Sequence, residues 1–263
     1  DEYDIKSTLG SSDGTYSPAG HNKQDNPFRI HEPNMIASDS EYSYVADTLN
    51  HRILKINNET MLVDRQFGVT EVSGADTGHV NLPSAVIPDA VDQVAAYIYV
   101  SDTGNKRIIK LKNNFGNLMY VKDTLTEAPA MPIENAGGMC IDKSLTPAEL
   151  YIAAGDKVLI YNSSSMLFME AITSLGAGAG FVNVTDVKYA GGYFYVVDKG
   201  ANQLYKVQNM RSPASVLKYN VNGGASRFAQ ALNAPSAVTI SPDLKDIFIA
   251  DKNGGKKNEK ISV

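Results

Sequence analysis

The sequence predicts an all-β fold built from repeated four-stranded units. Residues 44–56 read as a strand, a polar turn and a second strand, because β-prone apolar residues flank a run with turn chemistry. This segment returns almost intact at residues 99–111, and a third copy lies at residues 195–207. Weaker copies begin at Tyr151 and Phe248. Returns at a spacing of roughly 45–55 residues are typical of a repeat array, and no helical periodicity competes with the strand pattern.

Each unit is expected to contain strands A, B, C and D in chain order, joined by short turns. In the first unit, residues 39–41 and 57–59 supply the A–B and C–D turns, because Asp, Ser, Asn and Glu there interrupt the apolar strands. The expected strands are 35–37, 44–46, 53–56 and 61–68 in the first unit; 85–87, 97–101, 107–111 and 118–121 in the second; 139–141, 150–153, 158–161 and 166–171 in the third; 184–189, 193–197, 204–207 and 215–218 in the fourth; and 237–240, 247–250 and 260–263 in the fifth.

One sheet of this kind cannot bury both of its faces, whereas sheets packed radially can, as in a β-propeller. The fifth unit lacks strand D, and residues 4–9 form a spare strand ahead of the first unit. The sequence therefore predicts a single propeller domain, residues 1–263, with five four-stranded blades. Pairing of residues 4–9 with residues 260–263 is expected to close the ring. Six blades are the alternative if the chain is truncated.

The segment YVADTLNHRILKI, residues 44–56, resembles the NHL repeat, which is named for an Asn-His-Leu motif. Asn50-His51-Arg52-Ile53 is the closest match to that motif. The resemblance covers nearly the whole chain and implies a propeller, which in this family is commonly six-bladed. It selects no single function, because NHL propellers serve as protein docking platforms, as RNA-binding modules and, in relatives, as enzymes.

The composition is that of a globular protein with an acidic balance. Charged residues make up 20% and hydrophobic residues 43% of the chain. The net charge of −5 argues against a nucleic-acid partner, and the basic run 252–260 is interpreted as a solvated loop. No apolar run reaches the ~20 residues that span a bilayer. Cys140 is the only cysteine, so neither an intrachain disulfide nor a thiolate metal cluster can form.

Acidic residues recur at one register of the repeat, where strand B ends. One interpretation is a ring of charges that binds a ligand. The other is structural: each Asp accepts backbone N–H bonds or pairs with a following Arg. The structural role is favoured, because these residues repeat with the scaffold instead of breaking its pattern. The motif positions are Asp47, Asn50, Arg52, Asp102, Asn105, Arg107, Asp198, Asn202 and Asp251.

The sequence contains no recognisable catalytic constellation. Its four histidines are His21, His31, His51 and His79. All lie in the first third of the chain, whereas a metal in a propeller channel is usually held by residues from several blades. The glycine-rich run 176–180 is not followed by a helix, and neither Gly-x-Ser-x-Gly nor His-Glu-x-x-His occurs. We therefore expect no catalytic residue, no metal and no cofactor.

Long loops are expected at one end of every blade, where the B–C turns and the D-to-A connections meet. Loops on a rigid scaffold commonly carry binding. We expect a non-enzymatic interaction or scaffold module that presents this face to another protein and serves as a subunit of an assembly. The alternatives are a propeller enzyme resembling amidating lyases, strictosidine-synthase-like proteins or lactonases, and an RNA-binding NHL module. The connections are 69–81, 112–135, 174–183 and 209–232.

Three sequons for N-glycosylation occur, at Asn58, Asn162 and Asn183. Asn58 and Asn162 are expected in the same C–D hairpin turn of two units, where a glycan would be tolerated. Together with the start at Asp1 instead of Met, they lead us to expect a secreted or extracellular protein. The lack of cysteine pairs argues the other way, although a ring of this size buries enough apolar surface to be stable without crosslinks.

Overall fold

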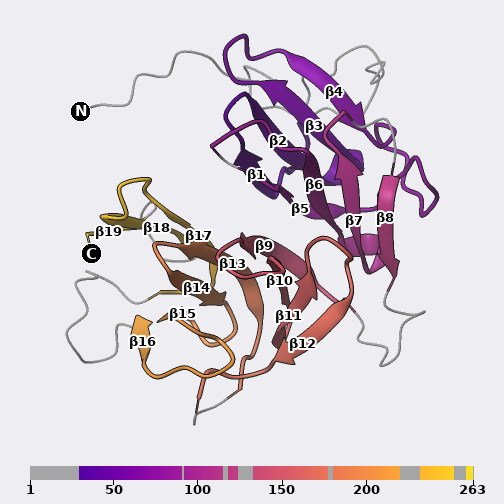
Figure 1. Ribbon diagram of the computed structural model, residues 1–263. Coiled ribbons are helices and arrows are strands. Elements are labelled where there is room, and N and C mark those ends of the chain that lie inside the picture. The colour runs from indigo at the N-terminus through magenta and orange to yellow at the C-terminus, as the bar shows by residue number, and fades with distance from the viewer. Residues whose placement is uncertain are drawn as a thin grey trace. The chain divides into compact units, whose positions relative to one another are not determined.

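The structure is divided into two compact units, Asp1–Ile133 and Glu134–Val263, which we describe separately as unit one and unit two. No helix in the described residues is long and apolar enough to cross a membrane. The computed structural model describes residues 30–90, 92–114, 118–123, 133–176, 180–219, 232–251 and 259–262 (Figure 1).

Within its described residues, unit one contains two antiparallel sheets, each with four strands that pair in chain order. The first sheet consists of β1 (Met35–Ser38), β2 (Tyr42–Asp47), β3 (Arg52–Asn57) and β4 (Val63–Phe67). The second sheet consists of β5 (Pro83–Pro88), β6 (Tyr97–Asp102), β7 (Arg107–Lys112) and β8 (Leu118–Asp123).

Unit two contains three antiparallel sheets, of four, four and three strands within the described residues. The third sheet of the chain consists of β9 (Ala136–Asp142), β10 (Glu149–Ala154), β11 (Lys157–Asn162) and β12 (Phe168–Ile172). The fourth consists of β13 (Val184–Ala190), β14 (Tyr193–Asp198), β15 (Gln203–Val207) and β16 (Val216–Tyr219). The fifth consists of β17 (Pro235–Ile240), β18 (Asp246–Asp251) and β19 (Glu259–Ser262).

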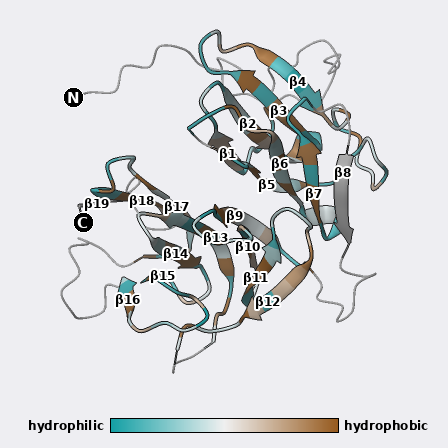
Figure 2. Ribbon diagram, in the orientation of Figure 1, coloured by the Kyte–Doolittle hydropathy of each residue, from teal (hydrophilic) through white to brown (hydrophobic). Residues whose placement is uncertain are grey.

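The fourth sheet is covered on both of its faces, as strand β14 shows. Its side chains alternate, because successive residues of a strand point to opposite faces. Phe194 and Val196 pack into the core shared with the third sheet. Tyr195 and Val197 pack into the core shared with the fifth sheet. A hydrophobic segment likewise forms the centre of β11, a middle strand of the third sheet (Figure 2). Sheets stacked face to face in this way are the building principle of a propeller.

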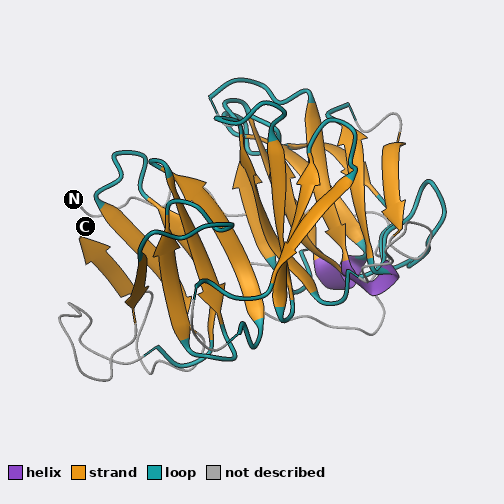
Figure 3. Ribbon diagram, turned by 60° about the horizontal axis from the view of Figure 1, so that its bottom comes forward, coloured by secondary structure: helices purple, strands orange, loops and turns teal. Residues whose placement is uncertain are grey.

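Strands form almost all of the regular structure (Figure 3). The exceptions within the described residues are two 3-10 turns, η2 (Thr48–Asn50) and η3 (Thr103–Asn105). Each occupies the polar B–C turn of a repeat. Each is followed by a residue with a left-handed backbone, His51 with φ 52° and Lys106 with φ 54°.

Strand D begins later than the sequence predicts in the first and third sheets. It was expected to begin at Met61 and at Met166, but β4 and β12 each begin two residues further on. Both methionines have positive φ, 57° and 58°. Their N–H groups donate to the carbonyls of Asn57 and Asn162 at 2.9 and 2.8 Å. These residues close the hairpin turn, so extended pairing can only follow them.

The predicted all-β fold of four-stranded antiparallel sheets is confirmed. Two further expectations lie outside the described residues. One is the closing strand at residues 4–9, and with it the fourth strand of the fifth sheet. The other is most of the basic run 252–260. The number of blades and the single-domain organisation therefore stay predictions.

Candidate functional site

In both sheets of unit one, the motif aspartate at the end of strand B fixes the backbone that leads into strand A. Asp47 Oδ1 accepts the backbone N–H of His31 at 2.7 Å. Asp102 Oδ1 accepts that of Asn81 at 2.6 Å. Both carboxylates are fully buried. Each carboxylate therefore fastens the backbone segment that leads into strand A of its own sheet.

The same contact recurs in unit two. Asp198 accepts the backbone N–H groups of Val182 and Asn183, both at 2.9 Å. Asp251 accepts that of Asn233 at 2.9 Å. A carboxylate that accepts backbone N–H groups caps a turn, which is the structural alternative considered above for these positions.

In the first sheet, Asn50 and Arg52 complete the motif. Asn50 Nδ2 donates to Asp47 Oδ2 at 2.8 Å, and Arg52 Nε donates to the same oxygen at 2.7 Å. Arg52 Nη1 also donates to Gln66 Oε1 at 3.1 Å and to Thr70 Oγ1 at 3.0 Å. Arg52 is only 1% exposed. Its charge is therefore paired with Asp47 inside the protein.

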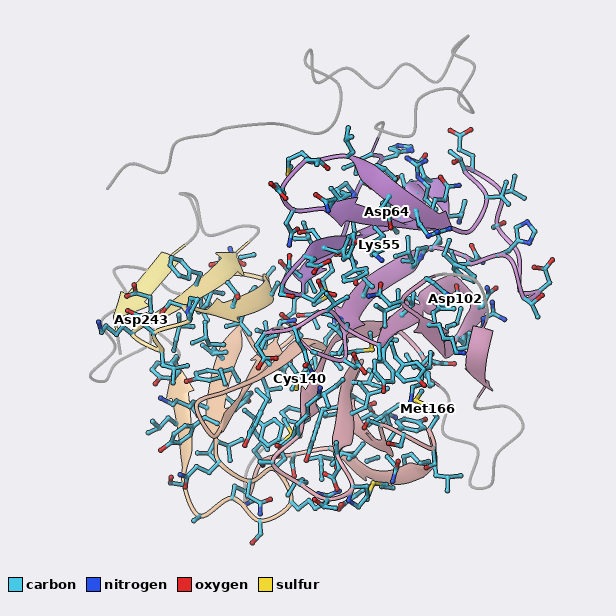
Figure 4. The ribbon with its side chains drawn as sticks, turned by 45° about the horizontal axis from the view of Figure 1, so that its top comes forward. Lys55, Asp64, Asp102, Cys140, Met166 and Asp243 are labelled. Carbon is cyan, nitrogen blue, oxygen red and sulfur yellow. The ribbon has the colours of Figure 1, made fainter. Side chains whose placement is uncertain are left out.

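The second sheet repeats the arrangement around Asp102, which Figure 4 marks among the strands of unit one. Asn105 Nδ2 and Arg107 Nε donate to Asp102 Oδ2 at 2.8 and 2.5 Å. Asn105 also donates to the carbonyl of Gly74 at 2.7 Å, and Arg107 Nη2 to that of His79 at 3.0 Å. Burial raises the pKa of Asp102, although these donors oppose the rise. The motif side chains thus hold the backbone of the long connection between the two sheets.

The position of His51 links neighbouring sheets. His51 Nδ1 accepts the backbone N–H of Leu82 at 3.1 Å. Asn202 follows Asp198 by the same four residues that separate His51 from Asp47, and its Oδ1 accepts the backbone N–H of Ala234 at 2.8 Å. Leu82 and Ala234 directly precede β5 and β17. The sequence analysis placed Asn202 in the motif but did not identify its contact with the residue that precedes β17. The available signal was its spacing of four residues from Asp198, which equals the spacing of His51 from Asp47.

The motif end of unit one exposes apolar side chains on a fixed loop. We call the B–C turns 48–51 and 103–106, together with the loop 68–82, the motif face. Exposed fractions are 44% for Val69, 46% for Val72 and 39% for Leu82. The loop backbone is held by bonds such as Val72 N–H to the carbonyl of Val69 at 2.9 Å. In unit two the corresponding connections are only partly described, and Val182 is exposed there to 59%.

Asp39 organises the opposite end of the sheets in unit one. It accepts hydrogen bonds from the Tyr44 hydroxyl at 2.7 Å and from the backbone N–H of Ala95 at 2.9 Å. The backbone N–H groups of Glu41 and Tyr42 also donate to it. Burial alone would raise the pKa of Asp39, but these four donors lower it. The carboxylate therefore stays charged while it joins the first sheet to the second.

Arg211 has a comparable role in unit two. It reaches from the C–D connection of the fourth sheet to Glu149 in the third, with Nη1–Oε2 and Nη2–Oε1 distances of 2.8 and 3.1 Å. Its Nε donates to Glu170 at 2.6 Å. The Tyr151 hydroxyl donates to Glu149 at 2.7 Å. Sequence reasoning did not find this network or the one around Asp39.

No group of three or more His, Cys, Asp or Glu side chains in the described residues is arranged to hold a metal ion. His79 Nδ1 lies 2.6 Å from Asp76 Oδ1 on the motif face. Cys140 is buried, and this burial raises the pKa of its thiol. His21 lies outside the described residues. The described part of the chain thus brings together no set of side chains with evident catalytic chemistry.

No protein-family model matches the sequence. No curated protein matches it either. Among solved structures, a chain of a nidogen/laminin complex is 14% identical, with a TM-score of 0.62 over 85% of this chain and 73% of that one. A streptogramin B lyase is 12% identical, with a TM-score of 0.55 over 88% of this chain and 68% of the lyase.

The WD40 repeats of RRP9 are 9% identical, with a TM-score of 0.60 over 92% of this chain. The match spans only 62% of that chain. All three structures are β-propellers, and identities this low carry information about the fold alone. The chain therefore has a β-propeller fold.

Proposed function

We propose that this chain is a non-enzymatic NHL-type propeller that binds another protein through the motif face. One observation carries the proposal. The loop 68–82 exposes Val69, Val72 and Leu82 while the motif side chains of the second sheet hold its backbone. Single exposed apolar residues are ordinary, but three on one fixed loop form a candidate contact surface.

The fixed backbone favours binding for an entropic reason. Association is opposed by the ordering of loops and side chains, and a loop that is already held has less freedom to lose. Exposed charges at the same end are mixed in sign, with Glu32 and Asp76 against Lys106. We therefore expect apolar contact to supply most of the affinity, with a weak dependence on salt. The nidogen/laminin neighbour is a propeller seen in a protein complex, which supports a protein-binding function for this chain by analogy.

Binding to wild type and to two surface variants tests the proposal. The loop variant Val69→Ser/Val72→Ser is compared with Leu62→Ser, which changes a more exposed apolar residue in the C–D turn at the other end of the first sheet. From native extract, the loop variant is expected to recover at least tenfold less partner than wild type. The Leu62→Ser variant should recover as much partner as wild type. Loss in Leu62→Ser with retention in the loop variant would place binding elsewhere.

Two other outcomes would favour the alternative functions. A stoichiometric divalent ion in the purified full chain would favour a propeller enzyme, a class that the streptogramin B lyase neighbour represents. Binding of RNA with a steep loss of affinity on added salt would favour an RNA-binding module. Metal analysis and a salt titration against single-stranded RNA distinguish these functions from protein binding.

A further inference from the structure

The three sequons fall in two different structural settings. Asn58 lies in the C–D hairpin turn between β3 and β4, and Asn162 in the equivalent turn between β11 and β12. In an up-and-down sheet these turns lie at the end opposite the B–C turns. Asn183 directly precedes β13, at the motif end of the fourth sheet.

Asn58 is exposed and has a hydrogen atom to spare on its amide nitrogen. Its Oδ1 accepts the hydroxyl of Ser43 at 2.6 Å. Its Nδ2 donates one hydrogen to the carbonyl of Asp39 at 3.3 Å. A primary amide carries two N–H hydrogens, so the second can be replaced by a sugar without loss of either bond.

Asn162 holds its hairpin through the carbonyl of its side chain. Oδ1 accepts the backbone N–H groups of Ser164 and Ser165, both at 2.9 Å, and Nδ2 makes no hydrogen bond in the described structure. The strand register makes Asn57 its counterpart in the first sheet, where Oδ1 accepts the N–H groups of the next turn. The two sequons thus lie in equivalent turns of two sheets, but Asn58 is one residue further along its turn than Asn162. Attachment at Nδ2 leaves the Asn162 carbonyl free to keep its turn.

Asn183 has less room. Its backbone N–H donates to Asp198 and its carbonyl accepts the N–H of Lys199, at 2.9 and 2.8 Å. Its Cβ would lie 3.1 Å from a Cβ placed on Gly200. The hydroxyl of Thr185, the third residue of this sequon, is buried without a hydrogen-bond partner. The side chain is therefore half-buried in packing that a glycan would have to open.

We propose that Asn58 and Asn162, but not Asn183, carry N-linked glycans and that the chain passes through a secretory compartment. The reaction needs a lipid-linked oligosaccharide diphosphate as donor. A bond forms between Nδ2 and the anomeric carbon as the bond from that carbon to the diphosphate oxygen breaks. The amide nitrogen gives up one proton, and the lipid diphosphate leaves with the electron pair. The product keeps one N–H and the carbonyl, so Asn58 retains both of its hydrogen bonds and Asn162 retains the carbonyl that holds its turn.

The placement of these glycans fits the proposed interaction surface without depending on it. In each of the two modified sheets, the C–D turn lies at the end opposite the B–C turn of the same sheet, so the sugar on Asn58 leaves the motif face of unit one uncovered. A glycan on Asn183 would instead stand at the B–C end of its own sheet, the fourth. Because glycan occupancy and partner binding are measured separately, either proposal can fail while the other holds.

Peptide mass spectrometry of the protein from its native source, before and after peptide-N-glycosidase treatment, tests the proposal. The peptides with Asn58 and Asn162 are expected to carry hexosamine that the enzyme removes, and the Asn183 peptide to be unmodified. Modification of at least one turn site with Asn183 empty supports the assignment. Unmodified peptides at both turn sites, or a glycan on Asn183, would overturn it.

Variants of the full chain, secreted from cultured eukaryotic cells, supply the matched controls. Asn58→Gln, Thr60→Ala and Asn162→Gln are each expected to reduce the intact mass by one glycan. Asn57→Gln changes the neighbouring turn residue but keeps the sequon, so the glycan on Asn58 should remain. Melting temperatures verify that each variant is folded. Intact masses that change only by the substituted side chain in Asn58→Gln and Asn162→Gln would count against the proposal.

Discussion

At the residue scale, Asp47 shows how the motif keeps a charge stable away from water. One carboxylate oxygen accepts a hydrogen bond from a backbone N–H, and the other accepts hydrogen bonds from the side chains of Asn50 and Arg52. Neither Asp47 nor Arg52 is appreciably exposed. Removal of one member of such a pair leaves an uncompensated buried charge, whereas removal of both does not.

We expect Asp47→Ala to lower the free energy of unfolding by about 3–5 kcal/mol, because Arg52 would stay buried without its carboxylate. The double variant Asp47→Leu/Arg52→Met should be less destabilised than this single variant. Urea denaturation measures both, with Ser73→Ala on the exposed loop as a control within ~0.5 kcal/mol of wild type. A double variant less stable than Asp47→Ala would contradict the pairing.

The Glu149–Arg211 pair should make stability depend on pH. Burial by itself would raise the pKa of Glu149, but hydrogen bonds from Arg211 and Tyr151 lower it below its ordinary value of 4.5. A lowered folded-state pKa stabilises the protein above the unfolded value, and this contribution is lost as pH falls through the folded value. The melting temperatures of wild type and Glu149→Gln should therefore differ more at about pH 7 than at about pH 3. An equal difference at both pH values would show that the charge of Glu149 does not matter.

At the scale of strands and sheets, the parts that could be predicted are those with a local signal. Apolar strands and turn residues alternate along the chain, and the motif repeats with them, so the strands and the capping role of residues such as Asp47 could be anticipated. The links between sheets could not. Asp39 is hydrogen-bonded to Ala95 and Glu149 to Arg211, although these partners are 56 and 62 residues apart in the sequence. No local pattern indicates which distant residue will lie opposite.

The close packing of β9 against β13 gives a prediction at this scale. A Cβ placed on Gly138 would lie 1.7 Å from Asp186 Oδ1, a buried atom that cannot simply swing away. Gly138→Ala should therefore force the strands apart and cost about 1–3 kcal/mol or more. Gly78→Ala is the control, since its Cβ would meet Asp76 at an ordinary 3.7 Å. Thermal melts that show equal stability for the two variants would refute close packing at Gly138.

At the scale of the whole molecule, closure of the ring depends on a fourth strand for the fifth sheet, of which three strands are described. The sequence predicts that residues 4–9 supply its missing strand and so close one ring. Ile5→Asp should then lower the melting temperature by several degrees, since roughly 2–4 °C corresponds to 1 kcal/mol in a domain of this size. Ser11→Asp, outside the predicted strand, should leave it unchanged. Equal melting temperatures for the two variants would argue against this closure.

The measurement that tests the functional account most directly is hydrogen exchange of the full chain with and without the partner that wild type recovers. Amide exchange is expected to slow in the loop 68–82 and in the motif turns when the partner binds. Exchange in the C–D turn 57–62 should stay as it is in the free protein. Protection of the C–D turn, with an unchanged motif face, would contradict the account.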